Sequence, residues 1–295
     1  MEKGGKPLVK LICKQKKDGE RLFYRFLSYH ISTSLQETLV RNQPHYIVTV
    51  EDFEKNRALF SRVIKEYMMT DMRRAFAASI LTKTFYFEDE DEIAQIVQIV
   101  EDMGHGEREE LVKLLPRFNE AYYMIQSIEE VLESGGTEWF SFDSFLTFRM
   151  QKYYQHIVKM VELAIDEFKM EQEYQTYIHS LREYVKEKRA LKQIVHLVKK
   201  DLSLLFYDEH YNVMEQEILR KYLDKRLLTQ HPVYIDSSTI APLLSLAPKE
   251  IHVYLPSEED GIIRTIKNIF EERIQIHPIE NWSIHARGKS LDLLS

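Results

Sequence analysis

The sequence has little cysteine and no long uncharged apolar run. Cys13 is the only cysteine in 295 residues, so an intramolecular disulfide and a cysteine-rich zinc site are both excluded. A helix that spans a bilayer needs about eighteen apolar residues without charge, and no such stretch occurs. The apolar stretch at residues 8–12 is short and is interrupted by Lys10, so no secretory signal is expected. We therefore expect a cytoplasmic protein in a reducing compartment.

Recognised catalytic and nucleotide-binding motifs are also missing. The chain contains no Walker loop, no GxGxxG, no GxSxG and no HExxH, and its histidines are scattered. Asp208, Glu209, His210 and Glu215 lie close together, but their spacing matches no metal motif and predicts an exposed charged turn. We expect neither a cofactor nor a metal, and the sequence argues against an enzyme without deciding the question.

The composition is that of a folded protein with a weakly negative surface. Charged residues make up 29% of the chain and hydrophobic residues 44%, which is enough apolar material for a core. Lysine and arginine number 40 against 47 acidic residues, so the net charge is -7. A field of this sign weakly repels nucleic acid and anionic membranes. Partners of those classes are therefore disfavoured unless a local basic patch exists.

Hydrophobic periodicity divides the first 190 residues into two parts. Residues 1–50 are expected to form a β-α-β unit, with strands at residues 8–13 and 45–50 and a helical pattern that runs from Leu22 through Leu35 to Leu39. Residues 51–190 are expected to form a bundle of long helices. Its first helix runs to Ile80, a shorter one over residues 93–100 ends at Gly104, and Ser141 caps the longest, which bends near residues 169–172.

Residues 191–280 are expected to form a small α/β module, followed by a tail at residues 281–295. Short apolar runs at 194–198 and 202–207 favour a β-hairpin, and a helix is expected over 211–228. A strand at 233–235 and a short helix after Asp236 follow. Strands at 251–255 and 273–277 flank a helix at 261–270, which favours parallel pairing. The predicted fold class is mainly α with a smaller α+β part: a long-helix bundle and a C-terminal module with a small mixed sheet.

Two groups of residues are candidates for binding. Asp236, Ser237, Ser238 and Thr239 begin the short helix, where free amides and hydroxyls could hold a phosphate, although simple helix capping is favoured because no glycine-rich loop is present. The second group could contact a nucleic-acid backbone, but interleaved glutamates favour an ordinary solvated helix face with intrahelical pairs. This basic group comprises Arg182, Lys186, Arg189, Lys192, Lys199 and Lys200.

Three C-terminal segments carry a family resemblance. Residues 234–248 (YIDSSTIAPLLSLAP), 249–254 (KEIHVY) and 262–270 (IIRTIKNIF) resemble the YtxC-like sporulation proteins of endospore-forming bacteria. The likeness extends over most of the chain. The resemblance implies a cytoplasmic protein tied to the sporulation programme, and it implies no activity and no site residue.

The function expected from these observations is interaction or regulation without catalysis. Long helices with wide apolar faces accompany the lack of a chemical motif, so we expect at least one protein partner. The first alternative is a phosphate- or nucleotide-binding or enzymatic α/β module in the C-terminal third, at residues 236–239. The second alternative is nucleic-acid binding through the basic stretch at residues 182–200.

Overall fold

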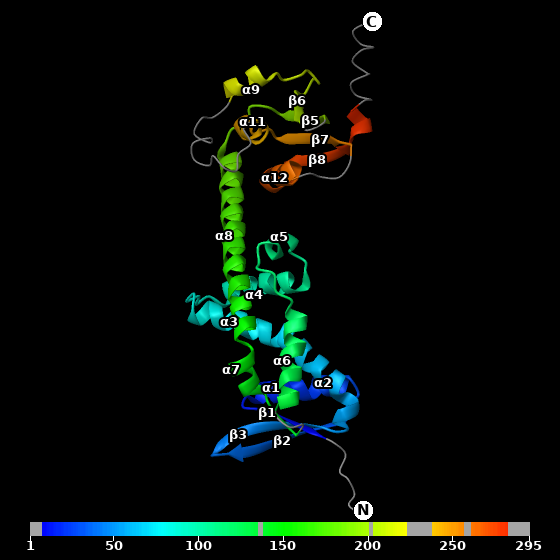
Figure 1. Ribbon diagram of the computed structural model, residues 1–295. Helices are drawn as coiled ribbons and strands as arrows, with labels where there is room; N and C mark the ends of the chain where they lie inside the picture. Colours follow the sequence, from blue (N-terminus) through cyan, green and yellow to red (C-terminus); the bar gives the residue numbers. More distant parts are fainter. Residues whose placement is uncertain (1–7, 135–137, 201–202, 223–237, 257–260, 283–295) are drawn as a thin grey trace, which may run out of the picture. The chain divides into compact units, whose positions relative to one another are not determined.

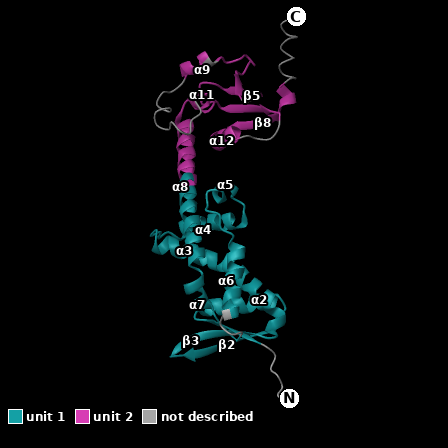
Figure 2. Cartoon of the chain, viewed as in Figure 1, with its two compact units in different colours: residues 1–170 teal, residues 171–295 magenta. Residues whose placement is uncertain are grey.

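The structure is a computed structural model that describes residues 8–134, 138–200, 203–222, 238–256 and 261–282. The chain divides into two compact units, residues 1–170 and residues 171–295 (Figure 1, Figure 2). The division falls inside helix α8 (Gln151–Glu187). Each unit has its own cluster of buried apolar side chains, so each has a core of its own.

The first unit begins with a four-stranded mixed sheet and one helix. Its elements are β1 (Val9–Cys13), α1 (Lys16–Ser28), β2 (Thr33–Val40), β3 (Gln43–Val50) and β4 (Trp139–Ser141). The strands follow the order β2-β3-β1-β4, with β1 antiparallel to β3 and parallel to β4. Helix α1 lies so close to β3 that a Cβ atom on Gly19 would be 2.8 Å from the Cβ atom of Tyr46. Glycine is therefore required at this contact.

The predicted β-α-β unit is wrong in its topology. Leu35 and Leu39 lie in strand β2 and not in the predicted helix. A two-residue turn at Arg41 and Asn42, with φ values of 51° and 62°, pairs β2 with β3 as a hairpin. The predicted strands are present as β1 and β3, but they run antiparallel, whereas a β-α-β unit pairs its strands in parallel.

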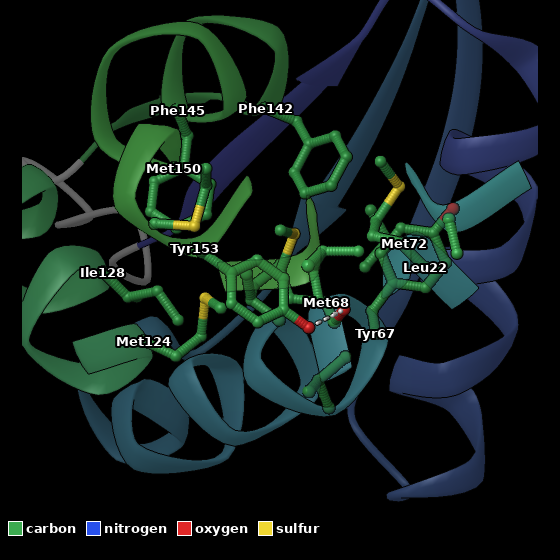
Figure 3. Packing of buried hydrophobic residues seen from close by; sticks show 14 of the residues in the cluster. Leu22, Tyr67, Met68, Met72, Met124, Ile128, Phe142, Phe145, Met150 and Tyr153 are labelled. Carbon is green, nitrogen blue, oxygen red and sulfur yellow. Dashed lines mark hydrogen bonds between the residues drawn. The ribbon is translucent and has the colours of Figure 1, made fainter. Parts of the chain in front are cut away.

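The rest of the first unit is helical. Its helices before α8 are α2 (Phe53–Tyr67), α3 (Arg73–Lys83), α4 (Glu90–His105), α5 (Glu109–Val112), α6 (Glu120–Ser134) and α7 (Phe142–Arg149). A π-helical turn at Met68–Met72 separates α2 from α3, so the long helix predicted up to Ile80 is interrupted. Around this turn, Tyr67, Met68 and Tyr153 pack together in the core (Figure 3).

The helix ends agree only in part with the predicted ones. Helix α4 passes Gly104 and ends at His105, and Gly106, whose φ of 81° lies in the left-handed region, caps it, so the predicted end at Gly104 is wrong. Ser141 is a helix cap, as predicted, and accepts a hydrogen bond from the amide of Ser144 at 3.3 Å, but instead of the longest helix it caps the short helix α7. That helix stops at Met150, and α8 then continues without interruption through residues 169–172, where a bend is predicted.

The second unit contains a mixed sheet in the order β6-β5-β7-β8. After α8 its elements are β5 (Ile194–Lys200), β6 (Ser203–Tyr207), α9 (Gln216–Tyr222), α11 (Ile240–Leu246), β7 (Glu250–Leu255), α12 (Gly261–Phe270), a 3-10 turn (Glu271–Arg273) and β8 (Ile274–Pro278). The hairpin of β5 with β6 and the parallel pairing of β7 with β8 are both confirmed.

One helix of the second unit differs from its prediction. Helix α9 begins at Gln216 and not at Tyr211, because Tyr211 has a φ of 61° and Val213 forms a bridge to Tyr207. The predicted strand at 233–235 and the predicted continuation of this helix to residue 228 lie outside the described residues.

The predicted fold class is confirmed. Helices predominate, and each unit holds a small mixed sheet of four strands. In the part of the chain that the structure describes, no helix is both long and apolar enough to cross a membrane.

Candidate functional site

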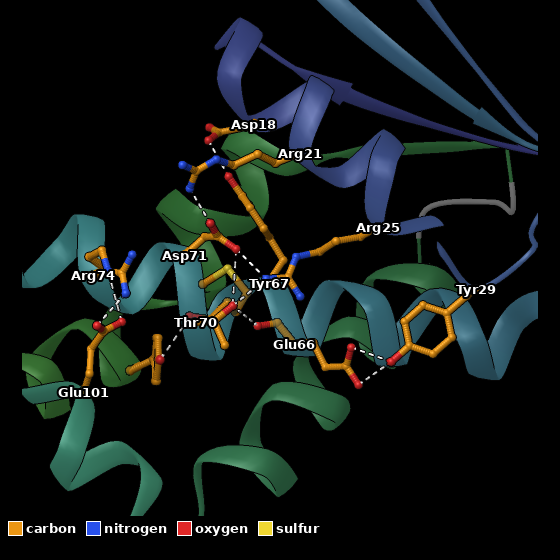
Figure 4. A network of polar contacts seen from close by, with 12 residues as sticks. Asp18, Arg21, Arg25, Tyr29, Glu66, Tyr67, Thr70, Asp71, Arg74 and Glu101 are labelled. Atoms are coloured by element: carbon orange, nitrogen blue, oxygen red, sulfur yellow. Dashed lines mark hydrogen bonds and ion pairs between the residues drawn. The ribbon is translucent and has the colours of Figure 1, made fainter. Parts of the chain in front are cut away.

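The π-helical turn carries polar contacts that join it to helix α1. Asp71 in the turn accepts hydrogen bonds from Arg21 and from Arg25, the latter at 2.5 Å (Figure 4). Burial raises the pKa of the Asp71 carboxyl, but the two guanidinium groups outweigh burial and hold that pKa below its ordinary value of 3.8. Tyr67, just before the turn, donates to Asp18 at 2.7 Å. Charged and polar side chains therefore anchor the turn to α1.

Arg73, directly after the turn, is a buried cation whose side chain is only 2% exposed. Its guanidinium donates to Glu120 at the start of α6, and Nε2 of His156 on α8 lies 3.1 Å from the other carboxylate oxygen. Burial raises the pKa of the Glu120 carboxyl, but the His156 hydrogen bond and the Arg73 charge outweigh it and hold that pKa below 4.5. We call Arg73, Glu120 and His156 the buried triad.

Gly104 provides the space that the Arg73 guanidinium occupies. This glycine lies in α4, and a Cβ atom at its position would overlap with the guanidinium group. The Nε atom of Arg73 is buried and has no hydrogen-bond partner among the described residues. The site is therefore built around an arginine that is closely packed and incompletely hydrogen-bonded.

Side-chain hydroxyls stabilise the π-helical turn. Tyr153 of α8 donates to the carbonyl oxygen of Met68 at 3.1 Å (Figure 3), and Thr70 donates to the carbonyl oxygen of Glu66 at 2.8 Å. The Met68 carbonyl oxygen also accepts from the Arg73 backbone amide, and Glu66 precedes the turn in α2, so these hydroxyls add to the backbone hydrogen bonds at and beside the turn. Turns of this kind are frequent at functional sites, and this one directly precedes a member of the buried triad.

A cavity of about 780 Å³ lies beside the buried triad, and Glu120 and His156 line it. Buried Met103 and Met160 contribute to its interior, and the segment at residues 112–121 that leads from α5 to α6 supplies most of the remaining wall. Its volume lies within the range of small-molecule sites, about 300–1,000 Å³. Two members of the buried triad, Glu120 and His156, therefore belong to the lining of an open, ligand-sized and mostly apolar cavity.

Glu120 and His156 are the paired acid–base groups in the lining of this cavity. Glu120 is paired with both a guanidinium and an imidazole, which stabilises its ionised form and leaves it a poor general base. The His156 ring packs on Phe118 with centroids 4.8 Å apart. Serine, threonine and cysteine are missing from the described lining of the cavity, so it offers no hydroxyl or thiol nucleophile.

The predicted phosphate site is only partly within the described residues. Asp236 and Ser237 lie outside them. Thr239 directly precedes α11, is 4% exposed and makes no capping hydrogen bond with its side chain, and its hydroxyl lies 3.5 Å from that of Ser238. Helix α11 has only 7 residues, and Pro242 supplies no backbone donor in its first turn. Phosphate binding at this position stays a prediction.

Three members of the predicted basic group are paired within the second unit. Arg182 donates to the Asn268 carbonyl oxygen at 2.6 Å and pairs with Glu271 at 3.1 Å. Lys186 forms an intrahelical pair with Glu183 at 2.9 Å, and Lys192 lies 3.3 Å from Glu209. Of the other members, Arg189 follows α8, and Lys199 and Lys200 end strand β5. Nucleic-acid binding through this group stays a prediction.

The second sheet carries histidine and tyrosine side chains on the face opposite its apolar core. His252 Nδ1 lies 2.9 Å from His277 Nε2, and the Tyr254 hydroxyl lies 3.3 Å from His196 Nδ1. The Tyr211 ring stacks on His196 with centroids 4.5 Å apart. Among the described residues, no group of three histidine, cysteine or acidic side chains is arranged to hold a metal ion. The Trp282 ring also packs on this face, with its centroid 5.1 Å from that of Tyr254 and 6.1 Å from that of His196.

The buried triad was not among the residues predicted from the sequence. Its partners are 47 and 36 positions apart in the chain, so no local spacing connects them. One signal was present: Arg73 lies inside an apolar helical pattern, where a charge is unusual. That signal identifies one residue and leaves its partners unknown.

Fold and site together define an α+β protein with a charged cluster enclosed between helices. A family model described as the YtxC-like family matches residues 58–275. An uncharacterised protein, YtxC of Bacillus subtilis (strain 168), is 37% identical over 205 residues, which cover 70% of this chain and 71% of that protein. No solved structure matches the chain. The chain belongs to the YtxC-like family, and the matched range includes the π-helical turn and the buried triad.

Proposed function

We propose that this chain is a cytoplasmic regulatory protein of the sporulation programme. It acts by binding, and the cavity beside the buried triad is its binding site. The observation that carries the proposal is the pairing of Glu120 with Arg73 and His156 at the wall of a ligand-sized cavity. The association with sporulation follows from the family resemblance.

The position of the buried triad supports a regulatory role. Arg73 directly follows the π-helical turn, whose Asp71 is bonded to Arg21 and Arg25 of α1. A ligand that moved Glu120 would therefore act on a chain of contacts from the cavity to the turn and on to α1. Such a coupling needs two arrangements of the turn, and the ligand must bind one of them more tightly.

Spore formation tests this proposal directly. In an endospore-forming host, the gene is replaced by a version that encodes Val112→Trp, which places a large ring at the cavity wall. A version that encodes Leu114→Trp is the control. Val112 lines the cavity and is 37% exposed, whereas Leu114 is 68% exposed and lies outside the lining. We expect Val112→Trp to lower the count of heat-resistant spores as deletion does, and Leu114→Trp to leave it unchanged. Normal counts after deletion would contradict the sporulation role.

A second experiment examines the partner. The tagged chain is crosslinked in sporulating cells and purified, and the recovered proteins are identified. We expect one protein in near-stoichiometric amount with the unchanged chain and with Leu114→Trp, and less of it with Val112→Trp. Turnover of a metabolite by the purified chain at ordinary enzyme efficiency would show instead that it acts by catalysis.

A further inference from the structure

We propose that the cavity beside the buried triad binds a small amphipathic anion: an apolar chain or ring system with one carboxylate or phosphate group. This inference rests on the proposed function in taking the cavity as the binding site, and it adds the chemical class of the ligand. The apolar body lies against the methionines and Phe118, and the anionic group lies at Arg117.

The lining selects an apolar ligand body. Met69, Met103 and Met160 line the cavity together with Leu115 and Phe118. Methionine side chains are unbranched and adaptable, so such a wall fits apolar groups of varied shape. The ionised groups of the interior are already paired with each other, because Glu120 bonds both Arg73 and His156. A second charge placed among them would lose its hydration without gaining a free partner.

The free positive charge is at the wall of the cavity and not in its interior. Arg117 and Lys113 both line the cavity and are exposed. Lys113 lies 3.6 Å from Glu109 in a solvent-exposed pair, whereas Arg117 makes no ion pair or hydrogen bond with the described part of the chain. A guanidinium binds carboxylate and phosphate groups in two-point geometry. An anionic group at Arg117 would remain partly hydrated while the apolar body enters the cavity.

Calorimetric titration of the full chain with matched probes tests the ligand class. Decanoate and decyl phosphate carry both features, decan-1-ol carries the chain without the charge, and acetate carries the charge without the chain. Decanoate and decyl phosphate are used below their critical micelle concentrations. We expect both amphipathic anions to bind, decan-1-ol to bind about fivefold more weakly, as for the loss of an exposed ion pair, and acetate not to bind.

Substitutions at the wall separate the two parts of the ligand. Arg117→Gln, at an exposed position, should weaken the binding of decanoate about fivefold and leave the binding of decan-1-ol unchanged. Val112→Trp should abolish binding of both, and Leu114→Trp should change neither. The inference is wrong if neither anion binds, if decan-1-ol binds as tightly as decanoate, or if Val112→Trp binds both probes as the unchanged chain does.

The outcome is independent of the sporulation test. If decanoate binds as described and spore counts stay normal after deletion, the ligand class stands and the regulatory role in sporulation fails. If spore counts depend on Val112 and no probe binds, the ligand class fails and the role stands.

Discussion

Among the described residues, the Arg73 guanidinium pairs in the interior with the Glu120 carboxylate, whose other oxygen contacts His156. Removing one member of a buried ion pair leaves the other charge without compensation, which typically costs about 3–5 kcal/mol. We therefore expect Arg73→Met to lower the free energy of unfolding by about that amount. Urea denaturation followed by circular dichroism measures the change.

The double variant Arg73→Met with Glu120→Gln is the control for this prediction. It removes both charges, so we expect it to be more stable than Arg73→Met alone. If the free energy of unfolding of the double variant fell by the sum of the decreases in the two single variants, the two side chains would not interact. The buried triad would then not be energetically coupled.

The pKa of Glu120 predicts how acid acts on the folded chain. Since that pKa lies below 4.5 in the folded state, the stability that Glu120 contributes is present above this value. It is lost as the pH falls through the folded-state pKa. Between about pH 5 and about pH 3, the free energy of unfolding should fall more steeply in the unchanged chain than in Glu120→Gln. Parallel curves from urea denaturation at each pH would show that Glu120 does not carry this dependence.

Gly104 is a position where a methyl group should destabilise the protein. In most helices a change from glycine to alanine is favourable by about 1 kcal/mol. Here the added Cβ atom would overlap with the Arg73 guanidinium, and overpacking costs about 1–3 kcal/mol. We expect a lower melting temperature for Gly104→Ala, and no loss for the control Gly261→Ala, whose Cβ would meet nothing within 4 Å. Equal melting temperatures for both variants would contradict the close packing.

At the level of elements, the π-helical turn accepts a hydrogen bond from a hydroxyl of another helix. Tyr153→Phe would remove the hydrogen bond to the Met68 carbonyl oxygen, which still accepts from the Arg73 backbone amide, so the expected cost is that of one net hydrogen bond, about 0.5–1.5 kcal/mol. We expect lower stability and faster amide hydrogen exchange across residues 68–72. Tyr154→Phe is the matched control, because Tyr154 is 38% exposed and its hydroxyl makes no hydrogen bond in the described part of the chain. Exchange that is equally fast in both variants would show that the hydroxyl does not stabilise the turn.

Elements with strong local signals were predicted well, and those that depend on turn geometry were not. Helix α12 has the predicted bounds, since its apolar residues recur at helical spacing. Strand β2 was missed because Leu35 and Leu39 also fit helical spacing from Leu22. The distinguishing feature is the left-handed turn at Arg41 and Asn42. Asparagine favours that conformation, but arginine does not, so the local signal was weak.

At the scale of the whole molecule, the two separate cores predict two unfolding transitions. Ile64 is fully buried in the core of the first unit, and Ile266 is fully buried in that of the second. A change from isoleucine to alanine in a core costs about 2–5 kcal/mol. We expect Ile64→Ala and Ile266→Ala each to lower the midpoint of a different transition in differential scanning calorimetry. A single transition that both variants shift equally would mean that the units unfold together.

The sequence alone determined the fold class, the existence of most helices and strands, and the family, because these depend on local periodicity and on recognisable segments. The capping of α4 by Gly106 and the π-helical turn required the structure, since several backbone conformations fit the same local pattern. The candidate functional site depended on the tertiary structure more than any other feature. Arg73, Glu120 and His156 come from three helices, and only their packing around Gly104 brings a guanidinium, a carboxylate and an imidazole together in an interior where each charge needs a partner.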